Sequence, residues 1–176
     1  MGVSRLWASM TSELLLRRAE PADVDAIQRV ATESWHAAYD DIVGPEAVEA
    51  TLDEWYEDEA IQAGVDHEAQ DFFVAARDGT VLGFAHVGPH PPRYVHRLYR
   101  LYVHPDEWRQ GIGRQLLGEI EQALYDRDVD HYEAEVLADN EPAVAFYEST
   151  GFDRVEEYEG ELGGVPVDQV IFRKRV

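Results

Sequence analysis

Cysteine is absent from this chain of 176 residues, and lysine occurs only once, at Lys174. Without cysteine, disulfides, thiolate metal sites and cysteine nucleophiles are all excluded. No apolar run approaches the roughly 20 residues that a membrane-spanning helix needs, and residues 1–9 lack the apolar core of a signal peptide. The seven histidines form no His-Glu-x-x-His pattern or comparable cluster, so we expect no metal site.

Positive charge is also scarce, since 15 basic residues face 36 acidic ones and the formal net charge is −21. A field of this sign repels nucleic acids and anionic membrane surfaces, so neither is expected as a partner. An acid-rich, lysine-poor composition suggests a protein kept soluble in very high salt, where charge repulsion is screened within a few Å. We therefore expect a halophilic protein of the cytoplasm, while composition leaves its function open.

The apolar content of 45% is enough for one hydrophobic core in a chain of this length. Patterned sequence begins at Leu14, so residues 1–12 are expected to be a disordered extension and residues 13–176 a single domain. Strands are predicted at 14–18, 71–77, 81–87, 94–103, 131–137, 153–158 and 165–172, and helices at 21–39, 46–62, 111–124 and 140–150. This order predicts an α/β fold, a mixed sheet with helices on both faces.

The most informative segment is a strand that ends at Val103 and is followed by a glycine-bearing turn and a helix. The turn reads Gln110-Gly111-Ile112-Gly113-Arg114. A helix that starts here presents free backbone N–H groups and the positive end of its dipole, and glycines let an anion approach the backbone closely. The turn is therefore suited to a pyrophosphate.

Two glycines alone are weak evidence, because they also occur at ordinary strand-to-helix turns. A Walker loop is excluded because no Gly-Lys-Ser/Thr follows. A Rossmann fingerprint fits badly, because its third glycine would fall on Leu116. An NAD-dependent oxidoreductase is therefore disfavoured.

A second segment, Asn140 to Phe152, lies one strand further on and reads Asn-Glu-Pro-Ala-Val-Ala-Phe-Tyr-Glu-Ser-Thr-Gly-Phe. Asn140 is a good helix N-cap, Pro142 falls in the first turn, and Gly151 ends the helix. Together the two segments resemble the coenzyme A-binding motifs of the GCN5-related N-acetyltransferases (GNAT family). The resemblance covers nearly the whole chain from Leu14.

The resemblance implies an acetyl group transferred from acetyl-CoA to a primary amine, without a metal. It implies a central mixed sheet of six to seven strands, splayed between the strand ending at Val103 and the strand starting at His131. The pantetheine arm would lie in that gap, and the pyrophosphate would meet the N–H groups of residues 110–114. The cofactor-binding residues expected from the family are Leu101, Tyr102, Val103, Arg109, Gln110, Gly111, Ile112, Gly113, Arg114, Asn140 and Tyr147. One departure is Trp108, which stands where the family usually has Gln or Arg.

The resemblance also supplies candidate catalytic residues. Tyr147 matches the family's tyrosine that protonates the departing thiolate; the alternative is a core aromatic beside Phe146, and we favour the catalytic role. Glu135 lies where some members keep a glutamate that accepts the amine's proton through water. Glu133 shares its face of the strand and would raise the pKa of one carboxylate if both were buried. Two solvated glutamates, and His96 as the base, remain as alternatives.

The acceptor is a small-molecule or peptide amine whose identity the sequence leaves open. The stretch from Ser34 to Tyr39 is similar to one in a GNAT subgroup with poorly defined acceptors; we expect Trp35 in the core and place His36 and Tyr39 near the acceptor. Dimers are common in the family, so a homodimer is left open. A rival interpretation is a CoA-binding module of the same fold with little or no turnover.

Overall fold

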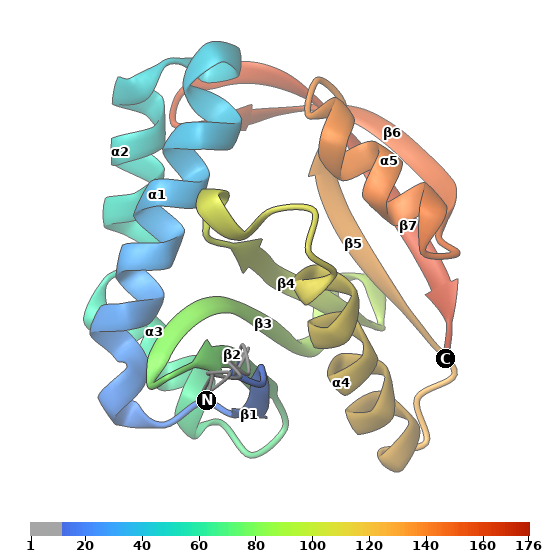
Figure 1. Ribbon diagram of the computed structural model, residues 1–176. Coiled ribbons are helices and arrows are strands. Elements are labelled where there is room, and N and C mark those ends of the chain that lie inside the picture. Colours follow the sequence, from blue (N-terminus) through green and yellow to red (C-terminus); the bar gives the residue numbers. More distant parts are fainter. Residues whose placement is uncertain (1–11) are drawn as a thin grey trace, which may run out of the picture.

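The central feature of the fold is a seven-stranded sheet in the order β1-β2-β3-β4-β5-β7-β6. The structure, a computed structural model, describes residues 12–176 (Figure 1). Its strands are β1 (Leu15–Arg18), β2 (Asp71–Arg77), β3 (Thr80–His90), β4 (Val95–Val103), β5 (His131–Leu137), β6 (Asp153–Leu162) and β7 (Val165–Arg175). Its α-helices are α1 (Val24–Val43), α2 (Pro45–Trp55), α3 (Asp58–Asp66), α4 (Ile112–Asp126) and α5 (Glu141–Ser149). The predicted mixed α/β fold is confirmed, whereas the expected N-terminal extension, apart from Ser12, lies outside the described residues.

The sheet splays between β4 and β5, the one parallel pair in the order given above. These strands pair only from His96 opposite Tyr132 to Leu98 opposite Ala134. Immediately afterwards β4 carries a bulge, because β3 pairs with Leu98 and then with Arg100, which leaves Tyr99 without a partner on β3. A bulge bends and twists its strand, so the second half of β4 turns away from β5. The predicted splay is confirmed, and the bulge is its local cause.

Two hydrophobic cores cover the two faces of the sheet. One core joins α4 and α5 to the sheet through residues such as Leu116, Val136 and Tyr147. The other joins α1, α2 and α3 to the opposite face through residues such as Trp35 and Leu137. Figure 1 shows the same division, with α1–α3 on one side and α4 and α5 on the other. Because strand side chains alternate, Val136 and Leu137 enter different cores.

The helix predicted at 46–62 is wrong in one respect, because the chain forms two helices there. Tyr56 separates them: its ring is buried, its φ is −123° and its backbone carbonyl accepts a hydrogen bond of 2.9 Å from the Gln28 side chain. The backbone of Tyr56 leaves the helical conformation, so α2 ends before it and α3 starts at Asp58. The first helix also runs further than residue 39, to Val43, and ends at Gly44 with a φ of +88°, a conformation that favours glycine.

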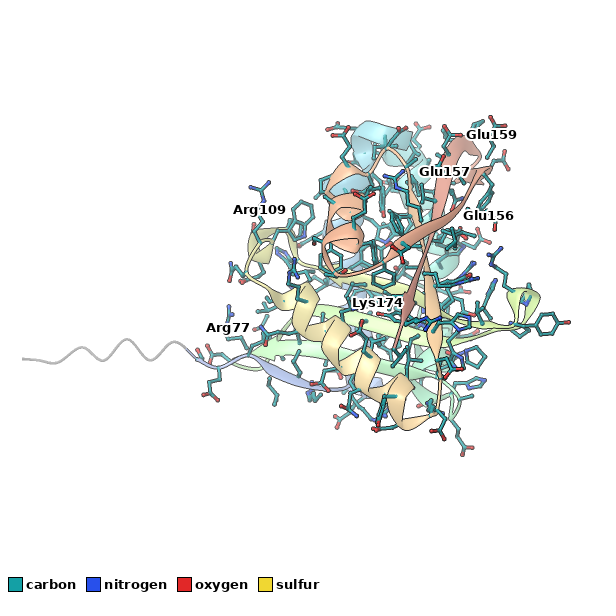
Figure 2. The ribbon with its side chains drawn as sticks, turned by 90° about the vertical axis from the view of Figure 1, so that its right-hand side faces the viewer. Arg77, Arg109, Glu156, Glu157, Glu159 and Lys174 are labelled. Carbon is teal, nitrogen blue, oxygen red and sulfur yellow. The ribbon has the colours of Figure 1, made fainter. Side chains whose placement is uncertain are left out.

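The strands β3 and β6 are longer than predicted, since hairpin pairing with the next strand carries them to His90, opposite Val95, and to Leu162, opposite Val165. Strand β6 forms an edge of the sheet and carries exposed carboxylates, among them Glu156, Glu157 and Glu159 (Figure 2). Charge on an exposed edge discourages pairing with another strand. Among residues 12–176 no helix is long and apolar enough to cross a membrane.

Candidate active site

The turn before α4 leaves a row of backbone N–H groups free at the start of this 15-residue helix. Gly111 is the N-cap, with a φ of +82°. The helical ladder starts with the Gln115 N–H, which donates to the Gly111 carbonyl at 3.1 Å. The amides of residues 112–114 therefore precede the ladder and lie at the positive end of the helix dipole. Trp108, at the position that departs from the family pattern, closes the turn by donating from its indole to the Val103 carbonyl at 2.7 Å.

Helix α5 lies against the start of α4. Arg114 donates from Nη2 to the Ser149 hydroxyl at 3.0 Å. A Cβ atom on Gly113 would lie 3.4 Å from the Phe146 ring, so a larger side chain would have to displace it or point away. Asn140 caps α5 as predicted, since its side chain accepts from the Ala143 N–H at 3.3 Å. Arg109 lies on the exposed turn, and its side chain points away from the body of the protein (Figure 2).

Three tyrosines connect α1, β4 and α5: Tyr39 and Tyr147 are buried, and Tyr102 is partly buried. Tyr147 stacks on Phe172 with ring centroids 5.7 Å apart, and burial together with the nearby Tyr39 raises the pKa of the Tyr147 hydroxyl. Burial also raises the pKa of Tyr39, against the hydrogen-bonding influence of Tyr102 and Asn140. The pKa of Tyr102 is raised well above its ordinary value, first by burial and then by Tyr39. All three hydroxyls therefore stay protonated at neutral pH.

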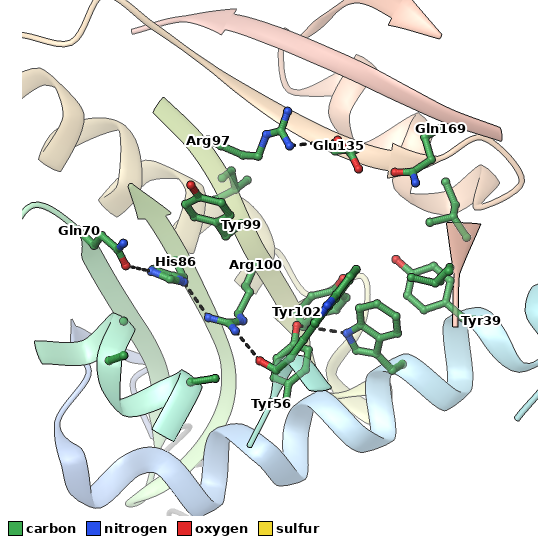
Figure 3. A pocket seen from close by; sticks show the side chains of 18 of the residues that line it. Tyr39, Tyr56, Gln70, His86, Arg97, Tyr99, Arg100, Tyr102, Glu135 and Gln169 are labelled. Atoms are coloured by element: carbon green, nitrogen blue, oxygen red, sulfur yellow. Dashed lines mark hydrogen bonds and ion pairs between the residues drawn. The ribbon is translucent and has the colours of Figure 1, made fainter. Parts of the chain in front are cut away.

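A cavity of about 530 Å³ opens on the face of the sheet that α1–α3 cover (Figure 3). Its aromatic lining comes from Trp35, Tyr39, Trp55, Tyr56, Tyr99 and Tyr102. Strand β4 from Arg97 to Tyr102 forms one wall, and β5 and β7 contribute Glu135 and Gln169 to another. A cavity of this size suits a small molecule. Trp35 is thus both a buried core residue, as predicted, and part of the cavity wall.

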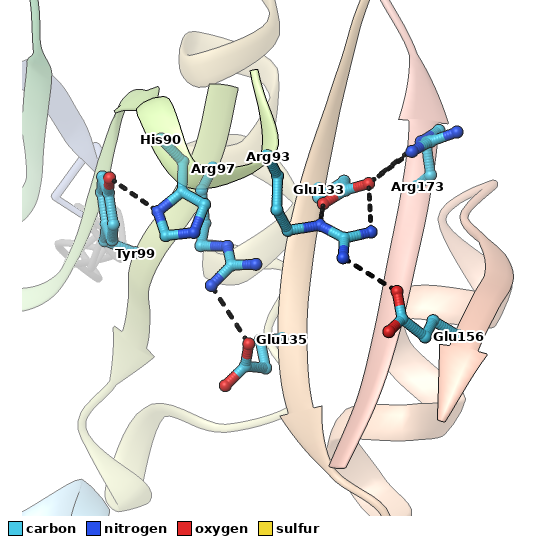
Figure 4. Close-up of polar contacts among 8 residues, drawn as sticks. All are labelled: His90, Arg93, Arg97, Tyr99, Glu133, Glu135, Glu156 and Arg173. Carbon is cyan, nitrogen blue, oxygen red and sulfur yellow. Dashed lines mark hydrogen bonds and ion pairs between the residues drawn. The ribbon is translucent and has the colours of Figure 1, made fainter. Parts of the chain in front are cut away.

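Glu135 reaches this cavity in an ion pair. Arg97 on β4 donates from Nη1 to the Glu135 Oε2 at 3.1 Å, across the widening gap between β4 and β5 (Figures 3 and 4). The Glu135 side chain keeps 26% of its surface exposed. Burial and the neighbouring Glu135 carboxylate raise the pKa of Tyr158 on β6 to about 12. Glu135 is therefore a paired but accessible carboxylate.

The neighbouring Glu133 is fully buried and has arginines of its own. Arg93 donates to it from Nε at 2.8 Å, and Arg173 donates from Nη2 at 2.6 Å (Figure 4). Burial pushes the pKa of Glu133 upward, but the hydrogen bonds from the two arginines outweigh it and leave the pKa below its usual value. The condition for a raised carboxylate pKa, burial of both glutamates, is not met, because Glu135 stays accessible and each glutamate has separate cationic partners.

The two histidines considered from sequence lie elsewhere. His96 belongs to the first half of β4, where burial and then Arg127 lower its pKa, and it is not among the residues that line the cavity. His36 contacts Asp40 one helical turn further along α1, with 2.7 Å between Nδ1 and Oδ1, and it does not line the cavity either. Tyr39, in contrast, does. Among residues 12–176 no three His, Asp or Glu side chains gather in a way that would hold a metal ion.

Comparison with known proteins decides the family. Residues 26–152 match the family model described as the acetyltransferase (GNAT) family. This chain belongs to the GNAT family. It is similar to YuaI of Bacillus subtilis, an uncharacterized N-acetyltransferase, at 28% identity over 88% of this chain and 89% of the relative. These matches make it an N-acetyltransferase.

Two further comparisons concern Thermoplasma acidophilum. The GNAT chain is 27% identical to the spermidine N(1)-acetyltransferase of that organism over 82% of its own length and 91% of the relative. Its fold superposes on the crystal structure of the PaiA N-acetyltransferase of the same organism in complex with coenzyme A, with a TM-score of 0.83, 25% identity, and coverage of 93% of this chain and 99% of that one. A shorter match, 45% identical over 32% of this chain and 38% of the relative, is to the ribosomal protein bS18-alanine N-acetyltransferase of Escherichia coli.

The sequence analysis missed several cavity residues of this GNAT protein, chief among them His86, Arg97 and Arg100. The first carried a signal, a histidine within the apolar strand predicted at 81–87. The two arginines carried none, since alternating polar residues on a strand are ordinarily solvated. Both arginines face the cavity because of the bulge at Tyr99, and the periodicity of the sequence does not predict that bulge.

Proposed function

We propose that this GNAT protein transfers an acetyl group from acetyl-CoA to a primary amine by direct attack, with Tyr147 as general acid and Glu135 as general base. The observation that carries the proposal is the position of the free amides of residues 112–114. They lie at the C-terminal end of β4, where β4 has parted from β5. Anion-binding amides and an open strand edge are what a long donor with a pyrophosphate at one end requires.

The donor site would be built from the diverging half of β4 and the turn before α4. Leu101 and Val103 belong to the core under α4, and Tyr102 packs toward α1, so the strand presents its free backbone edge to the gap. The Val103 carbonyl is already used by Trp108. The pyrophosphate would be held by the amides of residues 110–114, with Arg114 available for added charge.

The proposed acid and base approach the gap from opposite faces of the sheet. Tyr147 belongs to the core under α4 and α5, whereas Glu135 lines the cavity on the α1–α3 face. An amine in that cavity would meet the thioester carbonyl from one side while the sulfur leaves toward the other. This arrangement keeps the two proton transfers apart.

The proposed acetyl transfer has four steps. The amine nitrogen attacks the thioester carbonyl carbon, and its proton passes to Glu135 directly or through water. The tetrahedral intermediate collapses with cleavage of the carbon–sulfur bond. The hydroxyl of Tyr147, kept protonated by burial, gives its proton to the thiolate. The thiol has a pKa near 8.5, so positioning of the reactants supplies much of the rate.

The test of the donor site is a pair of glycine substitutions on one helix. Gly113→Glu places a carboxylate beside the proposed pyrophosphate, so CoA affinity measured by calorimetry should fall at least about tenfold through charge repulsion. Gly118→Glu adds the same charge five residues further along α4, at an exposed position where a Cβ meets nothing within 4 Å. It should leave CoA affinity within about twofold. Equal affinities in two folded variants would show that the site is misplaced.

The rival function, a CoA-binding module without turnover, is favoured by the ion pair that occupies Glu135 and by the unusual Trp108. A thiol-release assay with acetyl-CoA and a panel of primary amines separates the two. Release that depends on the amine supports the transferase. CoA binding without release from any amine supports the module.

A further inference from the structure

The charges that line the cavity do not cancel. Arg97, Arg100 and Glu135 are its charged residues apart from histidine. Arg97 and Glu135 form the ion pair described above. Arg100 is left over, and among residues 12–176 no carboxylate lies within ion-pair distance of it. The cavity of a chain with a net charge of −21 therefore carries a surplus positive charge.

Neutral groups hold Arg100 in place. Its Nη1 donates to the Nδ1 of His86 at 2.9 Å, its Nη2 donates to the backbone carbonyl of Trp55 at 2.6 Å, and its guanidinium carbon lies 4.9 Å from the centre of the Tyr56 ring (Figure 3). None of these partners is negatively charged. The contacts orient the guanidinium while leaving its charge intact.

The histidine in this arrangement is itself fixed. Because Nδ1 accepts from Arg100, the proton of the neutral ring is on Nε2, which donates to the Gln70 Oε1 at 2.6 Å. The ring stacks on Phe72 with centroids 4.7 Å apart. Burial, and then Arg100, lower the pKa of His86 to about 3, so the ring stays neutral and an acceptor for the guanidinium.

Arg100 also keeps donors free. A guanidinium has five N–H groups, and the contacts above use two of them. The three that remain suffice for a bidentate contact with a carboxylate, which an arginine fork matches in shape. Arg100 lies on the wall formed by β4, and Glu135 lies across the cavity on β5 (Figure 3).

We infer that the acceptor is a small amine that also carries a carboxylate, with the carboxylate bound by Arg100 and the amine directed toward Glu135. The inference rests on the proposed acetyl transfer and names the substrate class of that same cavity. A diamine or polyamine of similar length would instead bring a second ammonium group beside an uncompensated arginine. The overall negative charge of the protein does not remove this repulsion. Salt screens the attraction of distant surface carboxylates for the ammonium group, whereas Arg100 would act on it at contact distance.

The test compares matched acceptors in the thiol-release assay. The probes are unbranched ω-amino acids from glycine to 6-aminohexanoate, their primary amides, and diamines of the same lengths. We expect kcat/KM for the best amino acid to exceed that of its amide and diamine at least about tenfold. In Arg100→Met the KM for that amino acid should rise at least about tenfold while the KM for its amide stays within about twofold, which removes the preference.

Two further variants keep the result interpretable. Arg100→Lys retains a charge without the fork, so its preference for the amino acid should fall between those of wild type and Arg100→Met. The lysine variant also replaces the methionine variant if the latter does not fold. The matched control is Arg29→Met. Arg29 donates to the Val81 carbonyl at 2.8 Å, has no carboxylate partner among residues 12–176, and lies outside the cavity; its loss should leave the preference unchanged.

The outcomes separate the two proposals. Turnover that favours diamines or amides, or a preference for amino acids that survives in Arg100→Met, overturns the carboxylate inference while the acetyltransferase stands. Absence of release with every amine, in a protein that still binds CoA, overturns the proposed transfer and with it this inference. Loss of the amino-acid preference in Arg100→Met, with the preference kept in Arg29→Met, supports the carboxylate inference.

Discussion

Removal of the Tyr147 hydroxyl tests the proposed acid most directly. Tyr147→Phe keeps the ring that packs on Phe172 and on the edge of Phe152, and it removes one oxygen. General acids contribute roughly 100- to 10,000-fold to rates, but less is needed here because the thiol of CoA is already a fair leaving group. We therefore expect kcat to fall about 10- to 30-fold, with CoA affinity unchanged.

The stability of the same variant should change little. Among residues 12–176 the Tyr147 hydroxyl makes no hydrogen bond that its loss would break, so the expected cost is below about 1 kcal/mol, or a few degrees of Tm. Tyr132→Phe is the control, because the Tyr132 hydroxyl donates to Glu121 at 2.7 Å and neither residue lines the cavity. That control should lower the free energy of unfolding by about 1–2 kcal/mol and leave kcat intact.

Steady-state kinetics with a saturating amine, together with thermal melts of both variants, make this measurement. Because burial raises the pKa of Tyr147 above its ordinary value of about 10, the wild-type enzyme should not lose its acid as the pH rises from 7 to 9. Full kcat in a folded Tyr147→Phe protein would refute the reasoning. Tyr147 would then be a core aromatic only.

Three other predictions follow from charged and titratable groups. Glu135→Gln should depress kcat/KM most near pH 7, where the amine arrives protonated, and recover as the pH approaches the amine's own pKa; a wild-type pH–rate profile would remove Glu135 from the mechanism. The folded pKa of His86 is about 3 and its unfolded pKa about 6.5, so the unfolded state binds the extra proton between these values. The free energy of unfolding should thus fall by up to about 1.4 kcal/mol per pH unit below pH 6.5, and urea titrations from pH 6.5 to 4 should show a shallower fall for His86→Gln. If the acidic surface is an adaptation to salt, Tm should rise steeply from dilute buffer to molar KCl, and equal melting temperatures would contradict a salt-adapted origin.

Part of the proposed donor site could be predicted from sequence because it is built from local signals. A glycine with positive φ, the free amides after it and the cap at Asn140 all depend on residues within one or two helical turns. The strand and helix order followed from periodicity in the same way. The split between α2 and α3 was missed because Tyr56 is held by Gln28, which lies 28 residues away.

The sequence by itself determined the order of elements, the glycine-bearing turn before α4 and the family, since each depends on residue types at short, fixed spacings. Only the tertiary structure decided the electrostatics of the cavity. It paired Glu135 with Arg97 across 38 residues, gave Glu133 two arginines of its own, and left Arg100 without a carboxylate. The pairing of Glu133 with Arg173 follows from the register of β5 and β7, whereas the position of Arg100 depends on the bulge at Tyr99. The energy of a charge depends on which distant groups surround it, and no local pattern in the sequence specifies those neighbours.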